Sequence, residues 1–198
     1  MNVTFKAAVA ALILAVAVAR LVAAGPLEDA SDAAERRDYA TAIRLWRSLA
    51  DQGEVDAQYN LGVMYDKGQG VTRDYAVAVG WFRKAADQGF APAQLSLGVM
   101  YENGLGVTQD FTIAASWYRR AADQGDTSAQ LNLGFMYENG WGVTQNHVIA
   151  HMWFSLAAVR GDRDAARNQD IAAAKLTPAQ IAEAQRLFRE WDPNSAPR

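Results

Sequence analysis

The chain has 198 residues, 51% of them hydrophobic, which is enough for one domain with a sizeable core. Its 19 basic and 22 acidic residues give a net charge of −3, so we expect no basic surface for phosphate and no nucleic-acid partner. The absence of cysteine excludes disulfides, a lipid-modified cysteine and thiol chemistry.

The first 24 residues have the composition of a secretory signal peptide. An apolar run over 7–19 follows a lysine, and small residues suited to a processing enzyme end at Ala19 and at Ala24. A membrane anchor is the alternative, but the run stops at Arg20, short of the roughly 20 residues of a spanning helix. We therefore expect 1–24 to be removed after Ala19 or Ala24 and the protein to be exported, either periplasmic or secreted. Contact with a membrane is expected only through an uncleaved leader.

Three consecutive segments repeat one another at a spacing of 36 residues without a gap. They span 54–89, 90–125 and 126–161, and 15 of the 36 columns are identical in all three. Residues from about 37 to 53 match only the second helix of this unit, as a partial repeat. A fixed period of this length is typical of a solenoid, in which each unit buries its apolar face against its neighbours. We therefore expect 25–198 to form one solenoid domain.

Each unit is expected to contain two helices joined by a glycine-rich turn. In the first copy, helix one runs roughly over Val55–Asp66, Gly68 ends it in the left-handed conformation, and Asp74 is the N-cap of helix two. Trp81 is expected to fill the core between units. Gly62 and its equivalents Gly98 and Gly134 stand in mid-helix, and each costs about 1 kcal/mol of helix stability relative to alanine. This repeated cost predicts a backbone too crowded for a side chain at that position.

The third copy replaces charged residues by an apolar stripe. Met152, Leu156 and Val159 follow one another at helical spacing, and we expect C-terminal helices to cover them, because a terminal repeat needs a cover. The residues after the third copy therefore predict a C-terminal cap over 162–191, followed by a short tail, 192–198. An exposed partner site is the alternative for this stripe.

The turn offers a first candidate binding edge. The residue between its two glycines changes from Gln69 to Leu105 and then to Trp141 while the frame stays fixed. An apolar residue between glycines is poorly placed for burial, so Leu105 and Trp141 are candidate contacts for a partner along one edge. The alternative is that each side chain folds back on its own repeat.

Motifs of the common hydrolases and of phosphate and calcium sites are absent from the sequence. His147 and His151 stand four residues apart, a spacing that fits two metal ligands, but a third ligand is missing and His147 occupies a packing column. Asp66, Glu102 and Glu138 share one column, which predicts a solvated face and not an acid–base pair. We therefore expect no catalytic residue, no metal and no cofactor.

Each copy carries the pattern A-Q-x-x-L-G-x-M-Y, then G-x-G-V, then A, W-[FY], A-A and a closing glycine. This pattern resembles the Sel-one-like repeats, a branch of the tetratricopeptide-like superfamily, and the likeness covers about residues 39–191. In the first copy the matching residues are Ala57, Gln58, Leu61, Gly62, Tyr65, Gly68, Gly70, Val71, Ala78, Trp81, Ala85, Ala86 and Gly89. The resemblance implies an all-α protein, a right-handed α-solenoid of 36-residue helix-turn-helix repeats with a C-terminal helical cap.

The resemblance also implies a function. Members of this family are adaptors, assembly factors and regulators that hold other proteins. An exported bacterial member is thus expected to be a non-enzymatic adaptor or regulator in the cell envelope, with an envelope protein or peptide as partner. Some cysteine-rich relatives bind or hydrolyse β-lactams, so a cell-wall or β-lactam-acting hydrolase is the alternative. The absence of paired cysteines argues against it.

In tetratricopeptide-like solenoids, helix one lines the concave side, so the resemblance places a binding groove on the helix-one columns that face away from the core. These candidate binding residues are Asn60, Val63 and Lys67, then Ser96, Val99 and Asn103, then Asn132, Phe135 and Asn139. Phe135 is a candidate peptide contact there, and packing against the neighbouring helix is its alternative.

Overall fold

The computed structural model describes residues 25–191, so the predicted signal peptide and the short tail lie outside the described residues. The described part contains α-helices and no strand. In chain order the helices are α2 (Pro26–Glu35), α3 (Tyr39–Asp51), α4 (Val55–Lys67), α5 (Tyr75–Asp87), α6 (Ala91–Asn103), α7 (Phe111–Asp123), α8 (Thr127–Asn139), α9 (His147–Ala158), α10 (Arg163–Ala173) and α11 (Pro178–Glu190). None of these described helices has the length and hydropathy of a membrane span.

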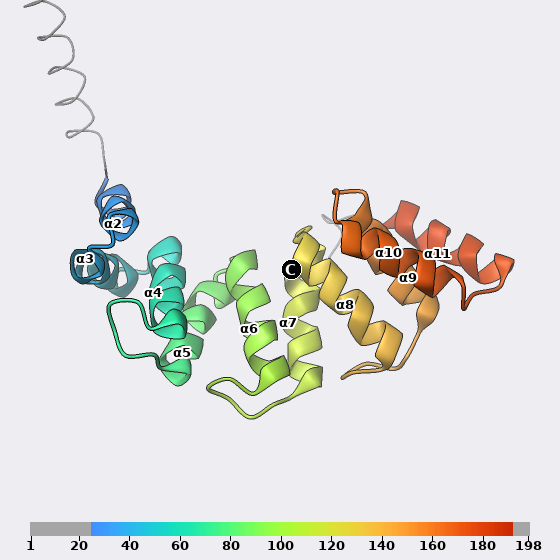
Figure 1. Cartoon of the computed structure of the whole chain (residues 1–198), viewed down its shortest axis with the longest axis horizontal. Helices are drawn as coiled ribbons and strands as arrows, with labels where there is room; N and C mark the ends of the chain where they lie inside the picture. Colours follow the sequence, from blue (N-terminus) through green and yellow to red (C-terminus); the bar gives the residue numbers. More distant parts are fainter. Residues whose placement is uncertain (1–24, 192–198) are drawn as a thin grey trace, which may run out of the picture.

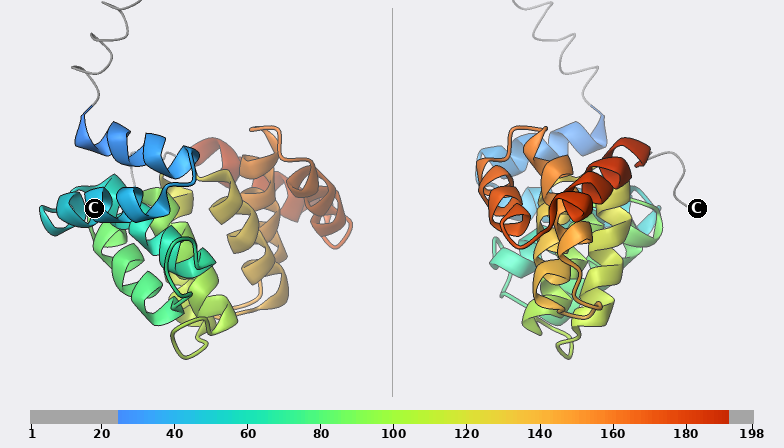
Figure 2. Two further views of the ribbon diagram at one scale, coloured as in Figure 1. Left: turned by 60° about the vertical axis from the view of Figure 1, so that its left-hand side comes forward. Right: turned by 90° about the vertical axis from the view of Figure 1, so that its right-hand side faces the viewer.

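The helices form a curved row of pairs, which confirms the predicted α-solenoid (Figure 1). Each helix packs against the next one along the chain from α2 to α10. The row of helices is curved in the further views as well (Figure 2). We call α4, α6 and α8 the first helices and α5, α7 and α9 the second helices of their units. The α10 helix starts 36 residues after α8, so it is the first helix of a fourth unit.

The helix ends are built from the turn residues as predicted. The second helices are capped by carboxylate or amide side chains that accept hydrogen bonds from backbone N–H groups two or three residues ahead. These N-cap residues are Asp74, Asp110 and Asn146. The first helices each end at a left-handed glycine, with φ of 67°, 68° and 74° at Gly68, Gly104 and Gly140.

The glycine in the middle of each first helix is explained by an aromatic ring. A Cβ on Gly98 would lie 2.4 Å from the ring of Tyr118 in the following second helix. The same overlap, 2.5 Å and 2.4 Å, joins Gly62 to Phe82 and Gly134 to Phe154. The prediction that a side chain has no room here is confirmed, but the predicted cause is wrong: a ring and not a backbone fills the space.

The units are also joined by a ladder of buried amides. The side-chain nitrogen of Gln94 donates to the carbonyl of Ala86 on the preceding helix, and Gln124 of the following helix donates to the Gln94 side chain at 2.7 Å. Gln58 repeats this pattern one unit earlier. The predicted burial of Trp81, Trp117 and Trp153 between units is confirmed. Packing therefore holds the array together without disulfides.

The C-terminal cap covers most of the apolar stripe on α9. Met152 and Leu156 are buried, and Leu187, Phe188 and Trp191 of the α11 end of the chain pack against the same cluster. The prediction is wrong for Val159, which is 68% exposed. Val159 is the C-cap residue of α9 and therefore lies beyond the last helical turn of the stripe.

Gly98→Ala is expected to lower the free energy of unfolding by about 1–3 kcal/mol, because the new methyl group overlaps the buried Tyr118 ring. Gly80→Ala is the matched control: a Cβ on Gly80, in α5, would meet no atom within 4 Å, so alanine should add about 0.5–1 kcal/mol to the stability. Denaturant unfolding followed by circular dichroism measures both. Equal effects of the two substitutions would contradict the ring-on-glycine explanation.

Candidate functional site

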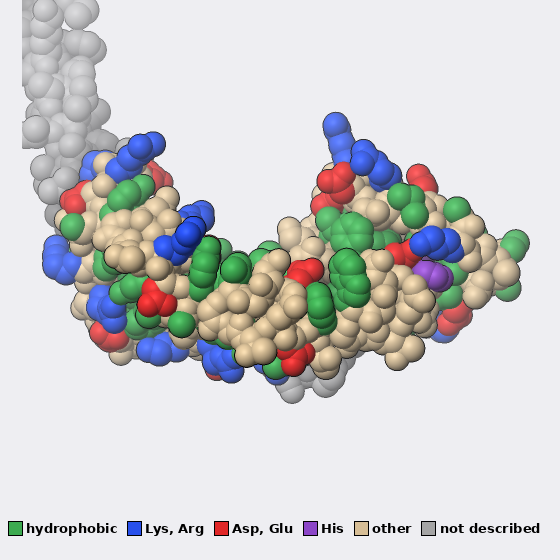
Figure 3. Space-filling view, turned by 60° about the horizontal axis from the view of Figure 1, so that its bottom comes forward, with side chains coloured by type: hydrophobic (Ala, Val, Ile, Leu, Met, Phe, Trp, Pro, Cys, Tyr) green, Lys and Arg blue, Asp and Glu red, His purple; other side chains and the backbone are tan. Residues whose placement is uncertain are grey.

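The predicted groove residues lie on one face of each first helix, at spacings of three and four residues that keep them together. We call this face the groove strip. Its middle column is apolar and consists of Val63, Val99 and Phe135, and Val99 is 36% exposed. Polar residues flank this column on both sides, namely Asn60, Ser96 and Asn132 on one side and Lys67, Asn103 and Asn139 on the other. The solenoid bends around a hollow (Figure 3).

Phe135 takes part in packing and remains half-buried. Its ring meets the ring of Phe154 edge to face, with 5.3 Å between centroids, and it packs beside Ala172 of α10. Of the two predicted roles for Phe135, packing against a neighbouring helix is therefore observed. Its remaining exposed part still belongs to the groove strip.

The fourth unit continues the groove strip, a continuation that the repeat motif does not predict. Ile171 lies 36 residues after Phe135 and is 48% exposed, while Asn168 and Lys175 continue the two polar columns. The repeat motif lapses in this unit because Gln169 and Asp170 stand where other units have leucine and glycine. The signal that finds Ile171 is the constant offset of 36 residues and not the motif.

The turn edge behaves differently at its two predicted contact residues. Leu105 is half-buried and packs against the core, whereas Trp141 is 44% exposed. The Trp141 ring lies 6.0 Å from the ring of Phe111, at the start of α7 in the preceding unit. A Cβ on Gly142 would lie 2.2 Å from the Phe111 carbonyl, so the turn backbone sits directly on that helix start. The Trp141 ring therefore contacts the preceding repeat and not its own repeat.

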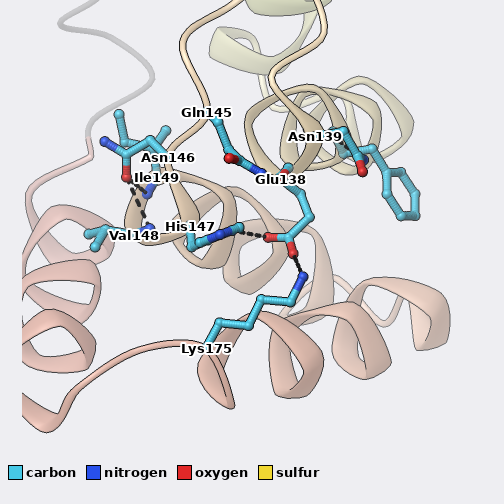
Figure 4. Close-up of polar contacts among 9 residues, drawn as sticks. Glu138, Asn139, Gln145, Asn146, His147, Val148, Ile149 and Lys175 are labelled. Atoms are coloured by element: carbon cyan, nitrogen blue, oxygen red, sulfur yellow. Dashed lines mark hydrogen bonds and ion pairs between the residues drawn. The ribbon is translucent and has the colours of Figure 1, made fainter.

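The prediction that the column of carboxylates is a solvated face is wrong for Glu138. Glu138 is buried, and its carboxylate accepts a hydrogen bond from Nδ1 of His147 at 2.9 Å and an ion pair from Lys175 (Figure 4). Burial acts to raise the pKa of Glu138, but the contacts with Lys175 and His147 outweigh it and leave the pKa below its ordinary value. The carboxylate of Glu138 is therefore ionised and held between two elements.

Glu102, one unit earlier, has a different partner. Its Oε2 accepts a hydrogen bond at 2.5 Å from the hydroxyl of Tyr118, the residue whose ring covers Gly98. Burial, and then the bond to Glu102, raise the pKa of Tyr118 far above its ordinary value, so the hydroxyl stays protonated and donates. The Tyr118 hydroxyl thus fixes the position of the Glu102 carboxylate.

The two histidines have separate environments. His147 contacts Glu138, whereas His151 is buried, and its Nδ1 lies 3.4 Å from the hydroxyl of Ser155. Burial lowers the pKa of His151, so the ring is neutral at pH 7. Across residues 25–191 no three histidine or acidic side chains come together in a group able to hold a metal ion.

Comparisons with known proteins agree with this architecture. The family model described as Sel1 repeat matches residues 32–54, 55–90, 91–126 and 127–162. The comparison with curated proteins found no match. Among solved structures, a Sel1 repeat protein from Oxalobacter formigenes is 29% identical with a TM-score of 0.70, and the match covers 82% of this chain and 74% of that one.

Two further solved structures are similar. A protective antigen present in uropathogenic Escherichia coli strains, which displays an SLR fold, is 32% identical with a TM-score of 0.59. That match covers 77% of this chain but 40% of the antigen. Cysteine-rich protein B of Helicobacter pylori is 24% identical with a TM-score of 0.51, over 70% of this chain and 93% of that protein, a likeness of fold alone.

Trp141→Ala is expected to lower the free energy of unfolding by only about 1 kcal/mol, because the ring loses one aromatic contact and little burial. Trp153→Ala, at a fully buried ring, is the comparison and should cost about 3–5 kcal/mol. Thermal and denaturant unfolding of both variants give the two values. A loss at Trp141 as large as that at Trp153 would show that the turn ring belongs to the core.

Proposed function

This chain belongs to the Sel1 repeat family, and from that premise we propose that it is a non-enzymatic adaptor or regulator that binds another protein or peptide in the bacterial cell envelope. Sel1 repeat proteins are generally protein-binding adaptors, and their fold is generally a non-catalytic interaction scaffold. The proposal for this chain adds the binding surface, the groove strip together with the turn edge.

The observation that carries the proposal is the apolar column of the groove strip. Val99 and Ile171 are large hydrophobic residues exposed at the same position of their units, and Val63 and Phe135 extend the column to four units. Val63 and Phe135 pack against the core clusters of the described residues, but Val99 and Ile171 do not, so packing does not require Val99 or Ile171. An aligned exposed apolar column flanked by polar side chains is suited to a partner that supplies both apolar contacts and hydrogen bonds.

The turn edge supports the proposal as a second contact. Trp141 presents a large ring at the surface with its backbone fixed on the start of α7. A ring held in place loses little freedom when a partner covers it, which is why tryptophan is common among residues that dominate binding energy.

The hydrolase alternative receives no support from the described residues. Two of the three acids in the carboxylate column have structural contacts, because Glu138 is bound by Lys175 and His147 and Glu102 accepts from Tyr118. The chain also lacks the cysteines of a cysteine-rich protein.

Export is the part of the proposal that rests on residues 1–24. A positive start, an apolar run and small residues at Ala19 and Ala24 support a cleaved leader and a location in the periplasm or outside the cell.

Photo-crosslinking in the native host tests the binding surface. A chain with p-benzoylphenylalanine in place of Val99 is expected to capture a discrete protein partner, because this position faces the proposed groove. The same amino acid in place of Val159, which is more exposed but lies at the end of α9, is the matched control. Mass spectrometry identifies the adducts. Equal capture at both positions, or none at Val99, would reject the groove strip as the binding surface.

The leader is tested separately by sequencing the N-terminus of the protein recovered from periplasm and medium. The mature chain is expected to begin at Arg20 or Gly25, after a small residue at the cleavage point. Full-length protein confined to the cytoplasmic fraction would contradict the proposed export.

A further inference from the structure

The ion pair between Glu138 and Lys175 links two successive units of the groove strip. Glu138 belongs to α8, and Lys175 follows α10, 36 residues after Asn139. Lys175 therefore occupies, in the fourth unit, the column that lies beside the carboxylate of the preceding unit (Figure 4). The chain itself thus shows how an ammonium group meets a carboxylate of this column.

The two earlier units have the carboxylate without the cation. Glu102 is followed in the next unit by Asn139, and Asp66 by Asn103, in the positions that correspond to Lys175. Both asparagines donate their side-chain N–H groups to carbonyls of their own helices, at 2.9 Å for Asn103 and 2.8 Å for Asn139. Amides at these positions provide no positive charge for the acids.

In residues 25–191 no basic side chain forms an ion pair with Asp66 or Glu102. The position of His147 is held by Phe111 and Tyr75 in the earlier units, and these rings carry no positive charge. Oε2 of Glu102 accepts the hydrogen bond from Tyr118, and Oε1 accepts no hydrogen bond from the described residues. Both acids are half-buried, so a cation reaching them is screened less than it would be at a fully exposed carboxylate.

The kind of cation follows from the surroundings. A metal ion needs several protein ligands, and the described residues bring no such group together. A lysine or arginine side chain needs one carboxylate, as the pair of Lys175 and Glu138 demonstrates. Val99 lies one helical turn before Glu102 on α6, so an apolar contact is available beside the charge.

We infer that the groove strip recognises a cationic segment of its partner polypeptide, in which a lysine or arginine next to apolar side chains binds Glu102 in the place that Lys175 takes on Glu138. This inference rests on the proposed function, and it adds the chemistry of the partner. The excess of acidic over basic residues in the chain supports the approach of a basic segment.

Selection from a random decapeptide library displayed on phage tests this chemistry. The purified protein is expected to enrich peptides that contain lysine or arginine beside apolar residues. Glu102→Gln keeps an acceptor for Tyr118 but removes the charge, and it should abolish the basic preference. Asn139→Lys should do the same by supplying an internal cation, as Lys175 does. Glu28→Gln removes an exposed charge on α2 and is the matched control with an unchanged preference. Circular dichroism confirms that each variant is folded.

One enriched peptide is then synthesised with its basic residue intact or replaced by norleucine. On the unaltered protein, norleucine should raise Kd by about tenfold or more, and on Glu102→Gln the two peptides should agree within about twofold. Enrichment without basic residues, no enrichment at all, or a basic preference that survives Glu102→Gln would overturn the inference. Crosslinking at Val99 reports on the proposed function independently, so a groove that captures a partner without this preference leaves that function standing.

Discussion

The contact on which this structure depends is the aromatic ring of each second helix lying on the glycine of its first helix. Phe82, Tyr118 and Phe154 are almost fully buried there, and a single Cβ on the facing glycine would overlap each ring. A glycine in mid-helix costs about 1 kcal/mol, but burial of a large ring contributes about 1.5–3 kcal/mol, so the exchange is favourable in every unit. The same close approach of ring and glycine recurs in all three units.

A constant pair geometry makes the spacing of 36 residues a spatial rule. Side chains that are 36 residues apart lie in one column along the array, whether or not they take part in its packing. The buried amides of Gln58, Gln94 and Gln130 form one such column and join each unit to the helix before it. Another column consists of Val63, Val99, Phe135 and Ile171. Its members Val99 and Ile171 are exposed and do not pack in the core, so a partner can contact them.

The sequence predicts the features that recur in every repeat. It does not predict the contacts that the non-repeating C-terminal cap makes with the repeats. Helix pairs, N-caps such as Asp74 and the left-handed glycines follow from local rules that apply in each copy. The burial of Glu138 does not, because its partner Lys175 comes from the cap, 37 residues away, where the motif has lapsed. Ile171 is missed for the same reason, and the ring on Gly98 needs a tertiary contact that no local pattern contains.

The same C-terminal segment interrupts the repeat motif and also supplies the cation that pairs with one acid of the carboxylate column. Asp170 stands at the position of the ring-bearing glycine and Gln169 at that of the core leucine, so α10 lacks the two residues that the other first helices use to pack against a second helix. A few residues later, Lys175 neutralises the last carboxylate of the column. The cap therefore completes the third unit internally, and the first two units keep amides where a cation would fit. The units therefore differ in charge along the array: the carboxylate of the third unit is paired with a lysine, and those of the first two units are not. This difference lies beside the exposed groove strip.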